Sequence, residues 1–129
     1  MKTANSSPLF SPLAIGGVTI KNRLAVSPMV TVYCDTDGMA TERFIAYHET
    51  KAKGGWGMII VEDYAVDPLG RGFWTPGLWK DEQIASHARL TERVRRAGSV
   101  IIAQIYHAGR QTSAGLIGAG AALAPGLAA

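Results

Sequence analysis

The chain has 129 residues, of which 47% are hydrophobic and 18% are charged, and its net charge is +3. This composition is typical of a globular protein with a hydrophobic core, so it excludes general disorder. The mild charge is scattered along the chain, which argues against an extended basic surface for nucleic acid or membranes.

The cysteine content and the N-terminus indicate the compartment. The single cysteine, Cys34, cannot form an internal disulfide and fits a reducing environment. The first residues lack the apolar core of a signal peptide, and no apolar run approaches the roughly 20 residues that span a membrane. We therefore expect a cytoplasmic protein with neither nucleic-acid nor membrane partners.

The predicted elements begin with a hairpin and a short strand. Two apolar runs within residues 14–20 are joined by Gly16 and Gly17, which is a hairpin signal. The continuous apolar run of residues 24–26 is typical of a parallel strand that is buried on both faces. A loop rich in Asp, Thr and Gly follows over residues 30–40.

A helix and a second strand come next. Thr41 precedes the helical pattern, and the two glycines at 54–55 end it. The face of this helix that we expect to be buried consists of Phe44, Ile45 and His48. Residues 58–61 form the clearest buried strand of the chain, and turn residues at 67–72 predict a loop after it.

A second helix and a third strand complete the pattern. Asp81 is the expected N-cap of a long helix that ends at Gly98, and residues 100–105 form the next buried strand. The residues expected on the inner side of this helix are Ile84, Ala88, Leu90, Thr91 and Val94. Strands that alternate with helices in this way predict parallel βαβ units with right-handed crossovers.

The end of the chain has a different composition. Residues 114–129 are dominated by alanine and glycine and carry no charge, so we expect a poorly ordered tail after a structured unit of residues 1–113. Two or three parallel strands cannot close a barrel, and their outer edges leave backbone groups unpaired. The pattern indicates either part of a larger barrel or a small open α/β sheet.

Candidate functional residues gather where the predicted strands end, which is where parallel α/β proteins bind ligands. Three groups occupy these positions, at residues 27–29, 62–64 and 104–110. Neither a Gly-x-Gly-x-x-Gly motif nor a phosphate loop occurs. The histidines and the cysteine lack the spacing of metal ligands, so we predict no metal site.

Several of these side chains have two interpretations. The Gln104 amide either caps local backbone groups or presents a donor and an acceptor to a planar heterocycle. His107 is either a turn histidine or a pocket wall or proton carrier, and Arg110 pairs with a surface carboxylate or holds a phosphate or ring oxygen. Glu62 and Asp63 are not expected to form a dyad, because adjacent side chains on a strand point to opposite faces.

Six short motifs, in order and in spacing, resemble one enzyme family. They are residues 9–13, 21–23, 27–29, 56–62, 67–71 and 104–110. From about residue 8 to 113 the chain resembles the N-terminal segment of Old Yellow Enzyme-type NAD(P)H:flavin oxidoreductases, the family of FMN-dependent ene-reductases and dienoyl-CoA reductases. The resemblance implies the N-terminal portion of a (β/α)8 TIM barrel with a preceding β-hairpin, that is, an incomplete barrel.

The resemblance also implies a cofactor and its contacts. FMN is expected at the carboxyl ends of the strands, with NAD(P)H as reductant. The family pattern assigns flavin contacts to the backbone of Pro28 and Met29 and to the side chain of Gln104. Asp63 stands at a flavin-contacting position where the family usually has a small residue, and its carboxylate disfavours the reduced flavin anion.

The substrate implied by the resemblance is a small enone or enoyl compound. His107 and Arg110 are the expected pocket residues, and Tyr33, which matches a loop tyrosine of one branch of the family, is the candidate catalytic residue. The His/His or His/Asn pair that grips the substrate carbonyl in the family, the proton-donating tyrosine and the late-strand loops for the FMN phosphate are missing from this chain.

Two functions therefore stay open. The first is FMN-dependent reduction of activated C=C bonds as part of a longer enzyme. The second is a non-catalytic small α/β fragment that binds a ligand or pairs with another half-barrel, and a homo-oligomer is compatible with both.

Overall fold

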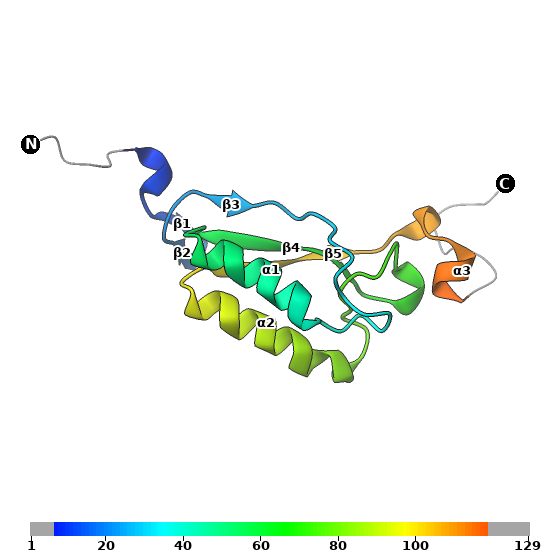
Figure 1. Ribbon diagram of the computed structural model, residues 1–129. Helices are drawn as coiled ribbons and strands as arrows, with labels where there is room; N and C mark the ends of the chain where they lie inside the picture. Colours follow the sequence, from blue (N-terminus) through cyan, green and yellow to red (C-terminus); the bar gives the residue numbers. More distant parts are fainter. Residues whose placement is uncertain (1–6, 119–129) are drawn as a thin grey trace, which may run out of the picture.

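The computed structural model describes residues 7–118, which form two small sheets and two long helices (Figure 1). The first sheet is an antiparallel hairpin of β1 (Leu13–Ile15) and β2 (Val18–Ile20). Gly16 at its turn has a φ of +57°, a left-handed conformation that glycine adopts without a side-chain clash. The hairpin predicted over residues 14–20 is confirmed.

The second sheet is parallel and has three strands in the order β3-β4-β5. They are β3 (Ala25–Val26), β4 (Met58–Ala65) and β5 (Val100–Tyr106). Helices α1 (Glu42–Lys53) and α2 (Ile84–Arg96) connect them, pack against each other and lie on one side of the sheet (Figure 1). The predicted succession of parallel βαβ units is confirmed.

Helix α1 begins and ends where the sequence predicts. Thr41 is the N-cap, and its side-chain oxygen accepts a hydrogen bond of 3.2 Å from the backbone N–H of Phe44. Gly54 is the C-cap, after a last turn whose two lysines complement the helix dipole. The buried residues of α1 include the whole predicted face, namely Phe44, Ile45 and His48.

Helix α2 departs from its prediction at the start. A 3-10 turn, η3 (Asp81–Gln83), precedes it, so Asp81 is not the N-cap of the α-helix. The side chain of Gln83 folds back instead, and its oxygen accepts hydrogen bonds from the backbone N–H groups of Trp79 and Lys80. A glutamine that bonds the backbone in this way replaces the aspartate cap.

The buried face of α2 is a second difference. Its buried residues are His87, Leu90 and Val94, at spacings of three and four residues that follow one side of a helix. The members of the predicted inner face that lie outside this side are Ile84, Ala88 and Thr91. Because histidine counts as polar in a hydrophobic pattern, the prediction left out His87 and shifted the expected buried face to an adjacent side of the helix.

The hydrophobic core lies between the helices and the sheet. Its fully buried side chains include Phe44, Ile45, Ile59, Val61, Leu90 and Val94. The strand β5, predicted to be buried, is largely exposed, and Ile105 is 63% accessible. The reason is that β5 is the edge of the sheet within residues 7–118, and the hairpin approaches it only at its amino end. Ala25 of β3, also predicted to be buried, is exposed for the same reason.

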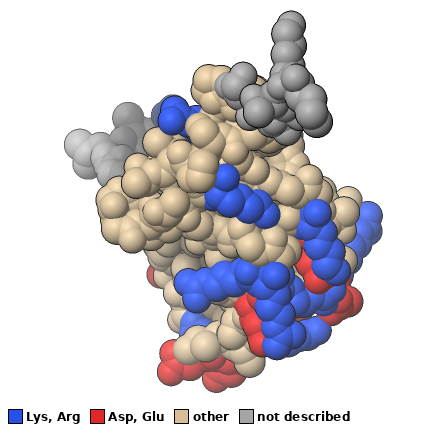
Figure 2. Space-filling model, turned by 90° about the vertical axis from the view of Figure 1, so that its left-hand side faces the viewer, with Lys and Arg blue, Asp and Glu red and all other residues tan. Residues whose placement is uncertain are grey.

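Ion pairs join the outer surfaces of the two helices. Arg93 of α2 pairs with Glu42 and Glu49 of α1, and Arg89 pairs with Glu42 at 2.8 Å. Figure 2 shows basic and acidic side chains interleaved over the helices, and most of the remaining surface of this face is uncharged. The face therefore carries no continuous basic surface.

Short helical turns complete the described range. They are η1 (Pro8–Phe10), η2 (Pro68–Gly70), η4 (Gly109–Gln111) and α3 (Ala114–Ile117). Helix α3 lies within the first residues of the predicted tail, where Ser113 caps it by accepting the N–H of Leu116, and Ile117 is buried. Residues 119–129 of the expected tail lie outside the described range. No helix of residues 7–118 is long and apolar enough to cross a membrane.

Candidate functional site

Two of the predicted site residues, Asp63 and Gln104, meet near the carboxyl ends of β4 and β5. The register of the two strands shifts between Val61 and Tyr64, which marks a bulge around Asp63. At this bulge Asp63 has a φ of +36°, a region that aspartate tolerates better than most residues. The backbone N–H of Asp63 donates a hydrogen bond of 3.2 Å to Oε1 of Gln104.

This contact engages one end of the Gln104 side chain. Its oxygen accepts from a backbone N–H of the neighbouring strand, whereas the first alternative placed the amide on local backbone groups. Its NH2 group has no acceptor among residues 7–118, and Gln104 is exposed, so the amide keeps donors for a ligand. A contact between Gln104 and a planar ring stays a prediction.

Asp63 and its neighbour Glu62 have different surroundings, as strand alternation predicts. Glu62 is buried against His48 of α1, whereas Asp63 is half-buried beside Gln104. Burial raises the pKa of Asp63, and the negative charge of Glu62 adds to this rise. The two carboxyl groups therefore do not share a partner and do not form an acid–base dyad.

Glu62 is the centre of a buried cluster that sequence reasoning missed. Its Oε1 accepts hydrogen bonds from the N–H of Thr31 at 3.1 Å and from the Thr31 hydroxyl at 2.6 Å. Its Oε2 lies 3.2 Å from Nε2 of His48. Burial by itself raises the pKa of Glu62, but the interactions with His48 and Thr31 outweigh burial and lower it. The sequence held a signal for this cluster: Glu62 follows an apolar strand, and the helix before that strand has His48 on its predicted buried face.

Pro28 and Met29 follow the carboxyl end of β3, next in the sheet to β4. Pro28 is half-buried and Met29 is 65% exposed. Three residues beyond Met29, Val32 has a φ of +58°, which is a strained conformation for a β-branched residue. The flavin contacts expected of Pro28 and Met29 stay predictions.

Tyr33, the candidate catalytic residue, contacts the start of α1. Its ring lies 3.9 Å under the guanidinium of Arg43 and meets the edge of Tyr47 at 5.8 Å between ring centroids. Its carbonyl accepts a hydrogen bond of 2.5 Å from the hydroxyl of Thr41. These contacts hold Tyr33 by α1, and its proposed role in catalysis stays a prediction.

His107 and Arg110 follow β5. The ring of His107 lies against Gly70, where an added Cβ atom would come within 2.5 Å of His107 Cδ2. Its Nδ1 accepts a hydrogen bond of 3.0 Å from the N–H of Gly109, which is the arrangement of a turn histidine. Arg110 is exposed in η4. The contacts of His107 are thus with the loop after β4 and with its own turn.

Cys34 belongs to the hydrophobic core and is 6% exposed. Burial raises the pKa of its thiol, and the nearby charges of Glu62 and Asp35 raise it further. The thiolate is therefore disfavoured. Within residues 7–118 no group of three or more His, Cys, Asp or Glu side chains is placed to hold a metal ion.

Comparison with known sequences gives the family. Residues 8–120 match the NADH:flavin oxidoreductase / NADH oxidase family. An NADPH dehydrogenase of Bacillus subtilis is 43% identical over 105 residues, which are 80% of this chain and 31% of that protein. An NADH oxidase of Thermoanaerobacter brockii is 40% identical over 110 residues, 84% of this chain and 17% of that protein. The chain thus spans less than a third of these relatives.

Solved structures agree with this match. The Old Yellow Enzyme homologue from Zymomonas mobilis has a TM-score of 0.77 and 31% identity, covering 87% of this chain and 31% of that one. A 2-naphthoyl-CoA reductase has a TM-score of 0.82 and 31% identity, covering 86% of this chain and 17% of that one. The predicted N-terminal portion of a (β/α)8 barrel is therefore confirmed. The chain belongs to the NADH:flavin oxidoreductase / NADH oxidase family.

Proposed function

We propose that this chain supplies the first strands of an FMN site in an oxidoreductase that reduces activated C=C bonds with NAD(P)H. The observation that carries the proposal is the Asp63–Gln104 contact near the carboxyl ends of two adjacent parallel strands, where ligands of such sheets bind. When bound, FMN supplies the hydride chemistry, and the protein supplies binding and orientation.

The residues at these strand ends have distinct tasks in the proposal. The donors of the Gln104 amide bind acceptors on the edge of the flavin ring, while its oxygen stays on the backbone of Asp63. The backbone of Pro28 and Met29 supports the ring from the end of β3. The raised pKa of Asp63 extends the pH range of its neutral form, which lessens repulsion from an electron-rich ring.

The reductant and the substrate class rest on the relatives. Two of them are named NADPH dehydrogenase and NADH oxidase, and one similar structure is a morphinone reductase with tetrahydroNAD, 30% identical. The name of the similar 2-naphthoyl-CoA reductase indicates that it acts on a conjugated acyl compound. We propose a small enone or enoyl substrate near His107 and Arg110, with Tyr33 as a catalytic residue, in a cytoplasmic enzyme.

Retention of flavin by the purified chain tests the proposal. FMN is mixed with the chain, and the absorbance spectrum is recorded before and after desalting. We expect flavin absorbance to remain with the protein and to fall several-fold in Gln104→Ala, while Gln111→Ala, an exposed glutamine of η4, retains it. A wild-type chain that emerges colourless contradicts FMN binding by this chain.

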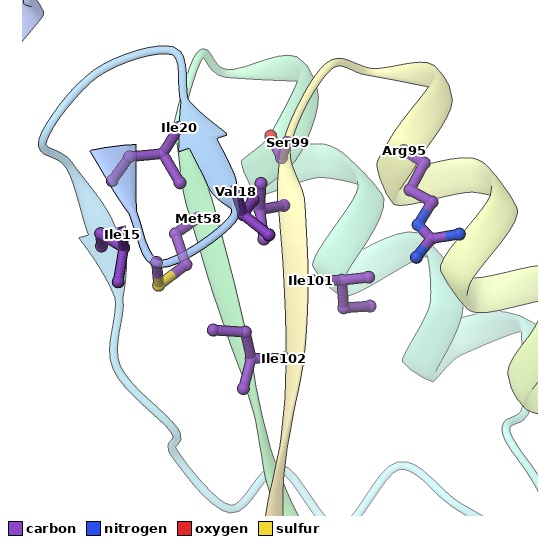
Figure 3. Close-up of a pocket in the computed structure, with 9 residues that line it drawn as sticks. Ile15, Val18, Ile20, Met58, Arg95, Ser99, Ile101 and Ile102 are labelled. Atoms are coloured by element: carbon purple, nitrogen blue, oxygen red, sulfur yellow. The ribbon is translucent and has the colours of Figure 1, made fainter. Parts of the chain in front are cut away.

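A second candidate function, pairing with another half-barrel, rests on an apolar pocket at the other end of β5. Figure 3 shows Ile15, Val18 and Ile20 of the hairpin facing Met58 and Ile102 of the sheet. The pocket has a volume of about 400 Å³, and among its lining residues only Arg95 and Ser99 are polar. It lies at the amino end of β5, so it is separate from Asp63 and Gln104.

The molar mass of the chain in solution tests this pairing. Ile102 of β5 lines the pocket and is 43% exposed, and Leu78, which lies outside it, is 45% exposed, so the two residues provide matched variants. If the pocket pairs with another copy, light scattering gives a mass above the monomer that Ile102→Ser lowers and Leu78→Ser leaves unchanged. A monomeric wild-type chain contradicts self-pairing.

A further inference from the structure

One carboxylate connects two of the strand ends that carry the proposed site. Glu62 directly precedes Asp63 on β4, and Thr31 comes two residues after Met29 beyond β3. Both the N–H and the hydroxyl of Thr31 donate to the same oxygen of Glu62, at 3.1 Å and 2.6 Å. The Pro28–Thr31 segment is therefore tied to the strand that bears Asp63.

The other oxygen of Glu62 is held from α1. It lies 3.2 Å from Nε2 of His48, and both side chains are 2% exposed. The imidazole of His48 is itself fixed by edge contacts with Phe44 at 4.7 Å and Tyr47 at 5.1 Å between centroids. The two hydrogen bonds from Thr31 hold one oxygen of this buried carboxylate, and the imidazole of His48 lies close to the other oxygen without completing a hydrogen bond. Loss of the Thr31 bonds would leave the buried charge with little compensation, which costs free energy.

Hydrogen bonds hold the residues before and after the strained residue Val32. Its φ of +58° is a genuine outlier for a β-branched side chain, and such a conformation persists only where the surroundings impose it. Thr31, the residue before it, is bound by Glu62, and the carbonyl of Tyr33, the residue after it, accepts the hydroxyl of Thr41. The chain thus follows a path here that it would not adopt without these contacts.

We infer that Glu62 is a positioning residue that, through Thr31, fixes the Pro28–Met29 step at the proposed flavin site, with His48 as the partner of its carboxylate. The inference rests on the proposed function, because it assigns the held segment to cofactor binding. Glu62 is buried, and its contacts are with Thr31 in the loop between β3 and α1 and with His48 of α1. It therefore acts on the proposed flavin site indirectly, through these protein groups.

Conservative substitutions of Thr31 test the positioning role in the full chain. Thr31→Val removes the hydroxyl and keeps the shape, whereas Thr31→Ser keeps the hydroxyl. FMN affinity is measured by quenching of flavin fluorescence, together with the visible spectrum of the bound flavin and the thermal midpoint. Because a hydrogen bond to a charged group is lost, we expect Thr31→Val to bind FMN about fivefold to tenfold more weakly and to shift the spectrum.

Two further variants separate positioning from general stability. Glu62→Gln keeps an acceptor for Thr31 but removes the charge, so we expect an affinity between those of the wild type and Thr31→Val. Glu49→Gln removes a carboxylate from α1 that pairs with Arg93 and Lys53, and we expect it to leave FMN affinity and the spectrum unchanged. Thr31→Ser should restore the wild-type spectrum as well as the affinity.

The outcomes distinguish the inference from the proposed function. If the wild-type chain binds FMN and Thr31→Val binds it equally well with the same spectrum, the positioning role is wrong while the proposed function stands. If Thr31→Val and Glu49→Gln weaken binding to the same extent, the effect is one of general stability and the inference is also wrong. If the wild-type chain binds no FMN, the proposed function fails first and the inference fails with it.

Discussion

The phenol oxygen of Tyr64 on β4 lies 3.2 Å from Nδ1 of His87 on α2, while Nε2 of His87 lies 3.1 Å from the carbonyl oxygen of Gly38. A carbonyl can only accept, so Nε2 carries the proton and Nδ1 accepts the Tyr64 hydroxyl. His87 is thus a neutral imidazole that connects the sheet, α2 and the loop before α1. Burial raises the pKa of Tyr64, which keeps its hydroxyl protonated as a donor.

This relationship predicts a pH dependence of stability. Burial lowers the pKa of His87 below 6.5, so the unfolded chain takes up a proton before the folded chain does. Stability contributed by neutral His87 is therefore present above pH 6.5 and is lost as the pH falls below it, by at most about 1.4 kcal/mol per pH unit. Urea unfolding at pH 7.5 and pH 5.5 measures this loss.

The control is His87→Gln, which keeps a polar side chain that does not titrate. We expect the wild-type chain to lose more unfolding free energy than His87→Gln between the two pH values. Equal losses would mean that other groups, and not His87, cause the dependence.

The strain at Val32 predicts an unusual glycine substitution. Val32 and Val30 are 41% and 42% exposed, but only Val32 has a positive φ. Val30→Gly should destabilise by about 0.5–1 kcal/mol because glycine has more freedom to lose on folding. Val32→Gly relieves a conformation that costs about 1–2 kcal/mol, so we expect it to be neutral or stabilising. Chemical denaturation of the two variants makes the comparison, and equal destabilisation would show that Val32 is not strained.

The close approach of His107 to Gly70 predicts a coupled pair of substitutions. A Cβ at Gly70 would come within 2.5 Å of the imidazole, so Gly70→Ala should destabilise by about 1–3 kcal/mol through overpacking. Adding His107→Ala should remove most of this cost, because the clash is with the ring. Gly115→Ala is the control, since nothing lies within 4 Å of the added atom. Additive effects in the double-mutant cycle would contradict a direct contact.

The local signals in the sequence determined the elements themselves. Helix α1 begins after Thr41 and ends before Gly54, because a side-chain oxygen at the N-cap and a glycine at the C-cap act on their own turn of the helix. The apolar run at 58–61 became a parallel strand for a similarly local reason, and the strand–helix order predicted parallel βαβ units. The positions of Asp63 and Gln104 at neighbouring strand ends followed from that topology, because parallel strands place their carboxyl ends together.

Only the tertiary structure decided which side chains meet across elements. The partners of Glu62 come from residues 31 and 48, and these contacts depend on how α1 and the β3–α1 loop pack on β4. The buried face of α2 was set by His87, whose burial depends on acceptors and donors that Gly38 and Tyr64 bring from distant parts of the chain. Polar residues are buried in a core only when hydrogen-bond partners are in place. The hydrophobic pattern of one chain segment does not show which distant residues supply these partners.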